Sequence, residues 1–264
     1  MSASAESALR ELLEVMARLR DPQDGCPWDL AQDFASIVPY TLEEAFEVAD
    51  AIERGESSAI RDELGDLLFQ VVFHARLGEE RGWFDFAAVA AGIAAKLRRR
   101  HPHVFAAGPR TDVGTQGAQW ERIKAAERGE AGEGGALGGV ARALPALSRA
   151  AKLGKRAGRV GFDWPDAAGV RDKVREELAE IDEVVASDDS AERRSEELGD
   201  LLFAVANWGR HLGVDAEEAL RAANRKFEAR FASMEALAAQ RGLALDGLSA
   251  AEWDALWTEA KRRR

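Results

Sequence analysis

Apolar residues recur at helical spacing along most of the chain, and few segments alternate as β-strands do. One such stripe consists of Leu9, Leu12, Leu13, Met16 and Leu19. Residues three and four apart share one face of an α-helix. The longest apolar run, from Phe86 to Ala95, is too short to span a bilayer. The pattern therefore predicts an all-α fold with no membrane partner.

The chain repeats its features in the same order on either side of a glycine-rich stretch. Residues 128–139 hold six glycines and are the predicted linker. We therefore expect two tandem helical units, at residues 1–127 and 140–264. Each half carries a basic helix, with Lys96 and Arg100 in the first and Lys226 and Arg230 in the second. Each half also closes on a tryptophan followed four residues later by a lysine: Trp120 and Lys124, then Trp257 and Lys261.

Four carboxylates occupy matching positions in the two halves. They are Glu44, Glu47, Glu63 and Asp66 in the first half, and Glu177, Glu180, Glu197 and Asp200 in the second. Within each half, two lie three residues apart before a turn and two lie three apart after it, so each pair shares one helix face. The turns are expected at Gly55 and at residues 187–190.

The spacing around Gly55 is mirror-symmetric. Glu47 and Glu63 lie eight residues from it on either side, while Glu44 and Asp66 lie eleven away. If the two helices pack as an antiparallel hairpin, all four carboxylates meet about 12–16 Å from the turn, at about 1.5 Å of rise per residue. The second half keeps nearly the same symmetry around a slightly longer turn.

Four facing carboxylates repel one another unless a cation joins them, and Mg²⁺ prefers carboxylate and phosphate oxygens. The pattern therefore predicts a Mg²⁺ site, with Mn²⁺ as a substitute, and phosphate chemistry. A solvated acidic face is the plain alternative. Gly65 and Gly199, which cost about 1 kcal/mol inside a helix relative to Ala, instead indicate close approach of another helix or a ligand. A di-iron bundle would require Glu-x-x-His, which neither half contains.

The amino-acid composition restricts the kinds of binding partner and the cellular compartment expected for this protein. The net charge of −11 argues against broad nucleic-acid binding. A single cysteine, Cys26, excludes an internal disulfide framework and is typical of a reducing compartment. The N-terminus has no basic start and no apolar segment of the kind found in signal peptides. We therefore expect a cytoplasmic protein.

Ordered motifs over nearly the whole chain resemble one known family. Besides Glu-Glu-x-x-Glu and Glu-Leu-Gly-Asp, they are Cys26–Asp29, Tyr40–Glu44, Arg99–Phe105, Val160–Trp164 and Lys226–Phe231. Together they resemble the MazG family of nucleoside triphosphate pyrophosphohydrolases, within the all-α NTP pyrophosphatase superfamily. The resemblance implies Mg²⁺-dependent hydrolysis of an NTP to the NMP and pyrophosphate, a role in clearing the nucleotide pool, and a homodimer. A regulatory protein that binds a nucleotide without hydrolysing it is the alternative.

Cations distinguish the two halves. Lys173 and Arg193 stand one helical turn before Glu177 and Glu197, whereas Tyr40 and Ala59 hold the matching positions in the first half. A triphosphate carries about four negative charges, which Mg²⁺ alone does not balance, so cationic side chains are needed beside the metal. We therefore expect chemistry in the second half. The first half is expected to be a structural or dimerising unit, with weak activity or nucleotide binding as the alternative.

The resulting assignment covers the second half. Mg²⁺ and catalysis are assigned to Glu177, Glu180, Glu197 and Asp200, with a second candidate metal site at Glu44, Glu47, Glu63 and Asp66. Substrate binding is assigned to Lys173, Arg193, Arg194, Lys226, Arg230, Trp257 and Lys261. In this assignment Trp257 stacks on the base and the cations hold phosphates.

Overall fold

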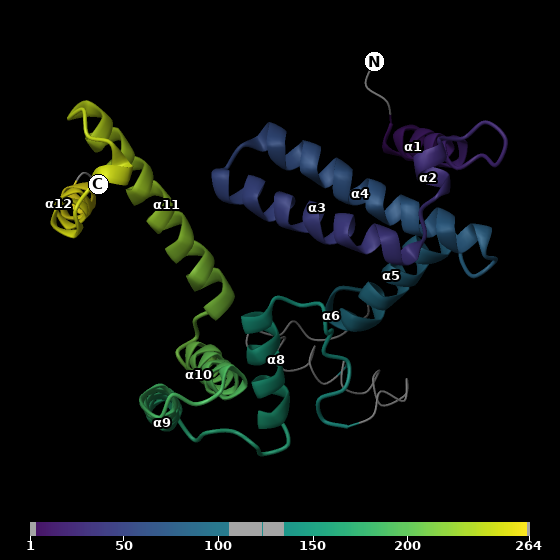
Figure 1. Ribbon diagram of the computed structural model, residues 1–264. Coiled ribbons are helices and arrows are strands. Elements are labelled where there is room, and N and C mark those ends of the chain that lie inside the picture. The colour runs from purple at the N-terminus through teal and green to yellow at the C-terminus, as the bar shows by residue number, and fades with distance from the viewer. Residues whose placement is uncertain (1–3, 106–122, 124–134, 263–264) are drawn as a thin grey trace. The chain divides into compact units, whose positions relative to one another are not determined.

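The computed structural model describes residues 4–105, 123 and 135–262. These residues form helices and turns, with no β-strand among them, as the hydrophobic pattern predicts (Figure 1). No helix in these ranges is both long and apolar enough to cross a bilayer. The chain divides into two compact units, residues 1–123 and 124–264. Most of the predicted linker, together with Trp120 and Lys124, lies outside the described residues.

The N-terminal unit contains one long helical hairpin among shorter helices. Its described helices are α1 (Ala5–Leu19), α2 (Pro27–Leu30), α3 (Phe34–Arg54), α4 (Ser57–Glu80), α5 (Phe86–Arg100) and α6 (Pro102–Phe105). Met16 of α1, Ile37 of α3 and Phe73 of α4 meet in a buried apolar core. Packing of α1 against one end of the hairpin therefore holds α3 and α4 side by side (Figure 1).

The C-terminal unit repeats the hairpin and adds a long helix. Its described helices are α8 (Ala146–Gly158), α9 (Ala167–Ala186), α10 (Ala191–His211), α11 (Ala216–Gln240), the 3₁₀ helix η1 (Leu245–Gly247) and α12 (Ala250–Arg262). Helices α9 and α10 pack along each other, and α8 packs on α10. A second apolar core joins the C-terminal half of α11 to α12 through Met234, Leu237 and Leu256.

Local sequence signals place the turns of both hairpins. Helix α3 begins with a capping box between Asp33 and Ser36 and ends at Gly55, whose φ of 73° is the left-handed conformation that glycine adopts without strain. In the second hairpin, the turn of residues 187–190 ends at Ser190, whose side chain accepts a hydrogen bond from the backbone N–H of Arg193. The two predicted turns are confirmed, and so are the two antiparallel hairpins.

An ion-pair network ties the loop before α9 to helix α10. Arg210 donates two hydrogen bonds to the Asp163 carboxylate, at 2.6 and 2.9 Å, and His211 Nε2 lies 3.0 Å from the same carboxylate. A side chain at Gly158 would collide with Asp163, because a Cβ there would lie 2.5 Å from Oδ2. The network therefore fixes the start of α9, which carries half of the carboxylates.

Replacing Asp163 by Asn should lower the free energy of unfolding by about 2 kcal/mol at pH 7, because Arg210 loses an ionised acceptor. Arg210 holds the pKa of Asp163 well below its ordinary value. The stabilisation is therefore complete above the unfolded pKa of about 3.9 and is lost as the pH falls through the lower folded value. Urea unfolding should show a smaller difference at pH 3 than at pH 7.

The matched control is Asp172→Asn. Asp172 pairs with Arg171 and Arg175, but 62% of its side chain is exposed, so its loss should change stability by less than about 0.5 kcal/mol. Equal losses from Asp163→Asn and Asp172→Asn would contradict the assigned role of Asp163.

Candidate metal centre

Three predicted carboxylates meet in the second hairpin. Glu177 of α9 and Glu197 and Asp200 of α10 each offer a ligand oxygen, and these oxygens lie within 4.8 Å of one another. Glu177 is only 4% exposed and Glu197 only 5%. We call these three residues the C-terminal carboxylate cluster. Two helices supply them from either side of the turn, in the arrangement that the mirrored spacing predicts.

Glu180, the fourth predicted ligand, borders this cluster without belonging to the compact group of three oxygens. Its pKa is raised, first by burial and then by the negative charges of Glu177 and Glu197. A cation at the cluster would remove this repulsion. Glu180 therefore lies close enough to the C-terminal carboxylate cluster to be affected by its charge.

Each buried glutamate of the C-terminal carboxylate cluster is paired with one cation. Lys173 Nζ lies 2.7 Å from Glu177 Oε1, and Arg193 Nη2 lies 2.8 Å from Glu197 Oε1. Lys173 also reaches Glu176 at 2.7 Å, and these two contacts raise the pKa of the lysine. Both cations are thus placed at the cluster, as the one-turn spacing predicts. The spacing along the sequence does not show that Lys173 and Arg193 form ion pairs with the carboxylates; this comes from the structure.

One oxygen of Glu177 remains unsatisfied. Its Oε2 atom is buried and has no hydrogen-bond partner, while Oε1 accepts from Lys173. A buried carboxylate oxygen without a partner is costly, and a bound cation would satisfy it. The donor set is all carboxylate oxygen, which suits a hard divalent ion such as Mg²⁺ better than softer metals. The residues therefore fit the predicted metal.

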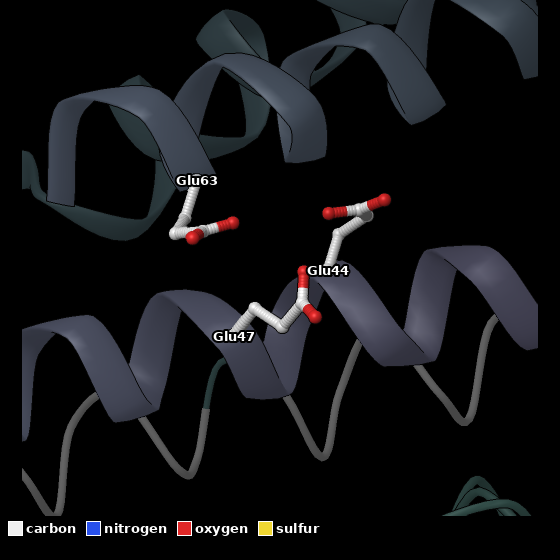
Figure 2. Close-up of side chains that lie close together, drawn as sticks. All are labelled: Glu44, Glu47 and Glu63. Atoms are coloured by element: carbon white, nitrogen blue, oxygen red, sulfur yellow. The ribbon is translucent and has the colours of Figure 1, made fainter. Parts of the chain in front are cut away.

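The first hairpin holds a similar cluster with a different charge balance. Glu44 and Glu47 of α3 and Glu63 of α4 extend into the space between the two helices (Figure 2). Their ligand oxygens also lie within 4.8 Å of one another, and we call them the N-terminal carboxylate cluster. Asp66 lies outside this group of three, yet its charge contributes to the raised pKa of Glu44.

No cation is paired with the N-terminal carboxylate cluster among the described residues. Burial, followed by repulsion from neighbouring carboxylates, raises the pKa of both Glu44 and Glu63. Tyr40, which occupies the position equivalent to Lys173, instead packs edge-on against Trp28 at 5.8 Å between ring centroids. Both clusters therefore offer carboxylate oxygens as ligands. Among the described residues, ion pairs between buried glutamates and a lysine or an arginine occur in the C-terminal carboxylate cluster.

The other predicted substrate-binding residues lie in two different places. Arg194 lies 3.7 Å from Asp188 in the hairpin turn and makes no ion pair with the cluster. Arg230 and Lys261 each lie over the ring of Trp257, at 5.6 and 5.4 Å from its centroid. This group belongs to α11 and α12. The structure thus brings Lys173 and Arg193 to the carboxylates, while Arg194 and the α11–α12 residues are placed elsewhere.

A cavity of about 660 Å³ adjoins the site and was not predicted from the sequence. Lys173 lines it, together with Phe162, Trp164 and Pro165 of the loop before α9 and Phe203 of α10. The Val160–Trp164 motif was the available signal in the sequence, because its two aromatic residues lie shortly before helix α9, which carries Glu177. The sequence of the motif does not show that Phe162 and Trp164 line the same cavity as Lys173.

Of the two alternatives predicted for Gly65 and Gly199, close approach of another helix is wrong for the described residues, while close approach of a ligand stays a prediction. A Cβ built at either glycine would meet no described atom within 4 Å, apart from its immediate neighbours and its own helix backbone. Neither glycine is therefore in close contact with another described helix, and Gly199 lines a cavity with residues of α8.

Comparison with known proteins agrees with these features. The model of a family described as the MazG nucleotide pyrophosphohydrolase domain matches residues 32–105 and 168–233, and so covers both hairpins. A nucleoside triphosphate pyrophosphohydrolase of Escherichia coli K12 is 50% identical over 96% of each chain. The nucleoside triphosphate pyrophosphohydrolase/pyrophosphatase MazG of Thermotoga maritima is 44% identical over 95% of this chain and 94% of its own.

Proposed function

Because this chain belongs to the MazG nucleotide pyrophosphohydrolase family, we propose that it hydrolyses nucleoside triphosphates to nucleoside monophosphates and pyrophosphate at the C-terminal carboxylate cluster. The observation that carries the proposal is the buried Glu177, which has one oxygen paired with Lys173 and the other unsatisfied. Such a group would hold a cation through its unsatisfied oxygen while the other oxygen positions a lysine that could bind phosphate.

In this proposal the acidic residues bind the metal ion and the basic residues bind the phosphates. Glu177, Glu197 and Asp200 would hold Mg²⁺, or Mn²⁺ in its place, with Glu180 at the edge of the site. When bound, the ion would supply Lewis-acid polarisation of the phosphate oxygens and would lower the pKa of a bound water. The Lys173 ammonium and the Arg193 guanidinium, which lie beside these carboxylates, would bind phosphate oxygens of the substrate.

The proposed reaction is attack of water on the α-phosphorus with pyrophosphate as the leaving group. Negative charge develops on the oxygen that bridges the α- and β-phosphorus atoms as its bond to the α-phosphorus breaks. Lys173 and Arg193 would stabilise the developing charge, because cations that are already positioned beside the carboxylates cost little reorganisation. Lys226, Arg230 and Lys261 would hold the remaining phosphates, and Trp257 would stack on the base.

The N-terminal unit is proposed to be structural and dimerising. Its carboxylate cluster lacks an ion-paired cation among the described residues, so it would hold a triphosphate poorly. We further propose a homodimer, a cytoplasmic location, and a role in clearing unwanted nucleotides from the cell. The two named pyrophosphohydrolases match this chain over nearly its whole length and support the same reaction.

Incubation with each common NTP, followed by separation of the products, tests the proposal. We expect NMP and pyrophosphate in the presence of Mg²⁺, and loss of turnover when EDTA removes the divalent ions. Restoration by added Mg²⁺ excludes damage by the chelator. Products of NDP and phosphate would contradict cleavage at the α-phosphorus. Binding without turnover across ordinary and damaged NTPs would instead favour the nucleotide-sensing alternative.

A further inference from the structure

A second cavity of the C-terminal unit lies between α8 and α10 and has no role in the proposed reaction. Its volume is about 360 Å³, and residues at the start of α8 and in the middle of α10 line it. Leu153 and Phe203 line both this cavity and the larger one beside Lys173, so the two are neighbours. Lys173 itself does not line the smaller cavity. We call the smaller one the α8–α10 cavity.

The α8–α10 cavity carries positive charge, although the chain as a whole has a net charge of −11. Arg142 and Arg149 line it, and no carboxylate is among the described residues that do so. Neither arginine forms an ion pair within the described part of the chain. By contrast, Arg171 and Arg175 both pair with Asp172. Two cations without a counter-charge in one cavity favour an anionic ligand.

One donor of Arg149 is buried without an acceptor. Its Nε atom is closed off from solvent and makes no hydrogen bond with any described residue. A buried charged donor that lacks a partner is costly, and an oxygen of a bound anion would remove that cost. At the C-terminal carboxylate cluster the unsatisfied atom is an oxygen of Glu177, which favours a cation. In the α8–α10 cavity it is a nitrogen, which favours an anion.

The first turn of α8 adds backbone donors to the two arginines. Ala146 and Leu147 begin this helix and line the cavity. Pro145, the N-cap residue, makes no side-chain capping hydrogen bond, and the first N–H groups of a helix have no partner within it. Such groups, together with the partial positive charge at a helix start, bind phosphate oxygens well. This turn therefore reinforces the preference that the arginines set.

The α10 side of the cavity is apolar and contains a glycine. Leu202 and Phe203 line it together with Gly199. A Cβ at Gly199 would meet no described atom within 4 Å, and the residue lies inside α10. Glycine at such a position costs about 1 kcal/mol relative to Ala. Without a side chain at residue 199 the cavity stays open, and its apolar side suits an aromatic group.

We propose that the α8–α10 cavity binds a phosphate monoester with an aromatic body. Its phosphate contacts Arg142, Arg149 and the start of α8, and its ring packs on Leu202 and Phe203. A monoester carries about 1.5–2 negative charges at pH 7, which two guanidinium groups balance. The volume lies at the small end of the range of about 300–1,000 Å³ found for ligand pockets.

The proposed monoester site is separate from the proposed catalytic site, yet both use helix α10. Gly199 lines the α8–α10 cavity and directly precedes Asp200 of the C-terminal carboxylate cluster. A ligand in the cavity therefore lies against the helix that supplies Glu197 and Asp200. This placement gives the cavity a physical connection to the carboxylates without a shared side chain.

Calorimetric titration of the full chain with phenyl phosphate tests the proposal. EDTA is present and NTP is absent, so the outcome does not depend on the metal or on the proposed hydrolysis. We expect one molecule bound per chain, and binding at least about tenfold weaker for inorganic phosphate and for phenol, since each lacks half of the ligand. Equal affinity for inorganic phosphate would indicate an adventitious ion only and would overturn the proposal. Absence of phenyl phosphate binding at millimolar concentration would also overturn it.

Two variants locate the bound phenyl phosphate. Arg149→Ala should weaken binding by about tenfold or more, because the phosphate loses a charged donor. Gly199→Leu should weaken it as strongly by filling the cavity, and it leaves both arginines in place should Arg149→Ala fail to fold. The matched control is Gly65→Leu at the equivalent position of the first hairpin, where a Cβ also meets no described atom within 4 Å. It should leave the affinity within about twofold, and equal losses from the two leucine variants would overturn the proposal.

Lys173→Ala distinguishes the α8–α10 cavity from the proposed substrate site. Lys173 lines the neighbouring cavity and contacts Glu177, so a phosphate bound there would lose affinity in this variant. The proposal expects the affinity for phenyl phosphate to stay within about twofold. A loss in Lys173→Ala without a loss in Arg149→Ala would place the phosphate at the carboxylates and would overturn the proposal.

Discussion

Glu177→Gln should lower kcat/KM for NTP hydrolysis by about a hundredfold or more, which corresponds to about 2.7 kcal/mol of transition-state stabilisation. The amide keeps the size of the side chain but removes the charge that attracts a divalent ion. It also leaves Lys173 without one of its two carboxylate partners. Steady-state kinetics over a range of Mg²⁺ concentrations should show both a lower kcat and a higher Mg²⁺ requirement.

The matched variant is Glu44→Gln, at the equivalent position of the first hairpin. It should change kcat/KM by less than about threefold, since the N-terminal carboxylate cluster lacks a cation pair that could hold phosphates. Thermal unfolding of both variants controls for folding, because loss of one member of a buried ion pair is itself destabilising. Equal losses of activity in two well-folded variants would refute the assignment of catalysis to the second hairpin.

Arg193→Ala should lower kcat/KM by about a hundredfold, the size expected when one preformed donor to a developing charge is removed. The Arg193 guanidinium is already 2.8 Å from Glu197 and therefore lies at the C-terminal carboxylate cluster. Because it is assigned to phosphate rather than to the ion, KM for the NTP and kcat should change while the Mg²⁺ requirement changes little. A raised Mg²⁺ requirement alone would show that Arg193 only positions Glu197.

Arg194→Ala is the matched control for Arg193. The two arginines are neighbours, yet Arg194 is placed at Asp188 in the turn, where 47% of its side chain remains exposed. Its loss should change kcat/KM by less than about threefold. A loss as large as that of Arg193→Ala would restore the sequence-based assignment of Arg194 to the substrate and would count against the structural distinction.

The hairpins were predictable because their determinants are local. A 3.6-residue period places Glu63 and Asp66 on one face, and Gly55 supplies the left-handed turn that reverses the chain. Equal spacing on either side of the turn then sets the carboxylates at one level. The structure confirms the fold class and both turns. It also places most of the predicted ligands together, with Asp66 and Glu180 at the edges of the two clusters.

The cation pairs were predictable only in part. A spacing of four residues places Lys173 one helical turn before Glu177, and Arg193 one turn before Glu197, on the same helix face. The spacing favours Arg193 over Arg194, which lies about 100° further round the helix, but it does not exclude Arg194, because the direction of a long side chain depends on its conformation. Nor could it show that one oxygen of Glu177 lacks a partner, because that depends on side-chain conformation and on packing from several elements.

The helical class, the duplication, the carboxylate hairpins and the family could all be predicted from the amino-acid sequence, because periodicity, turns and ordered motifs depend on short stretches of chain. Which carboxylates are buried, which cations contact them and where α11 and α12 lie became known from the folded structure. Those features depend on contacts between residues far apart in the chain. Burial strengthens the electrostatic attraction between Glu177 and Lys173. It also raises the free-energy cost of the unsatisfied Glu177 oxygen, because water is excluded from both.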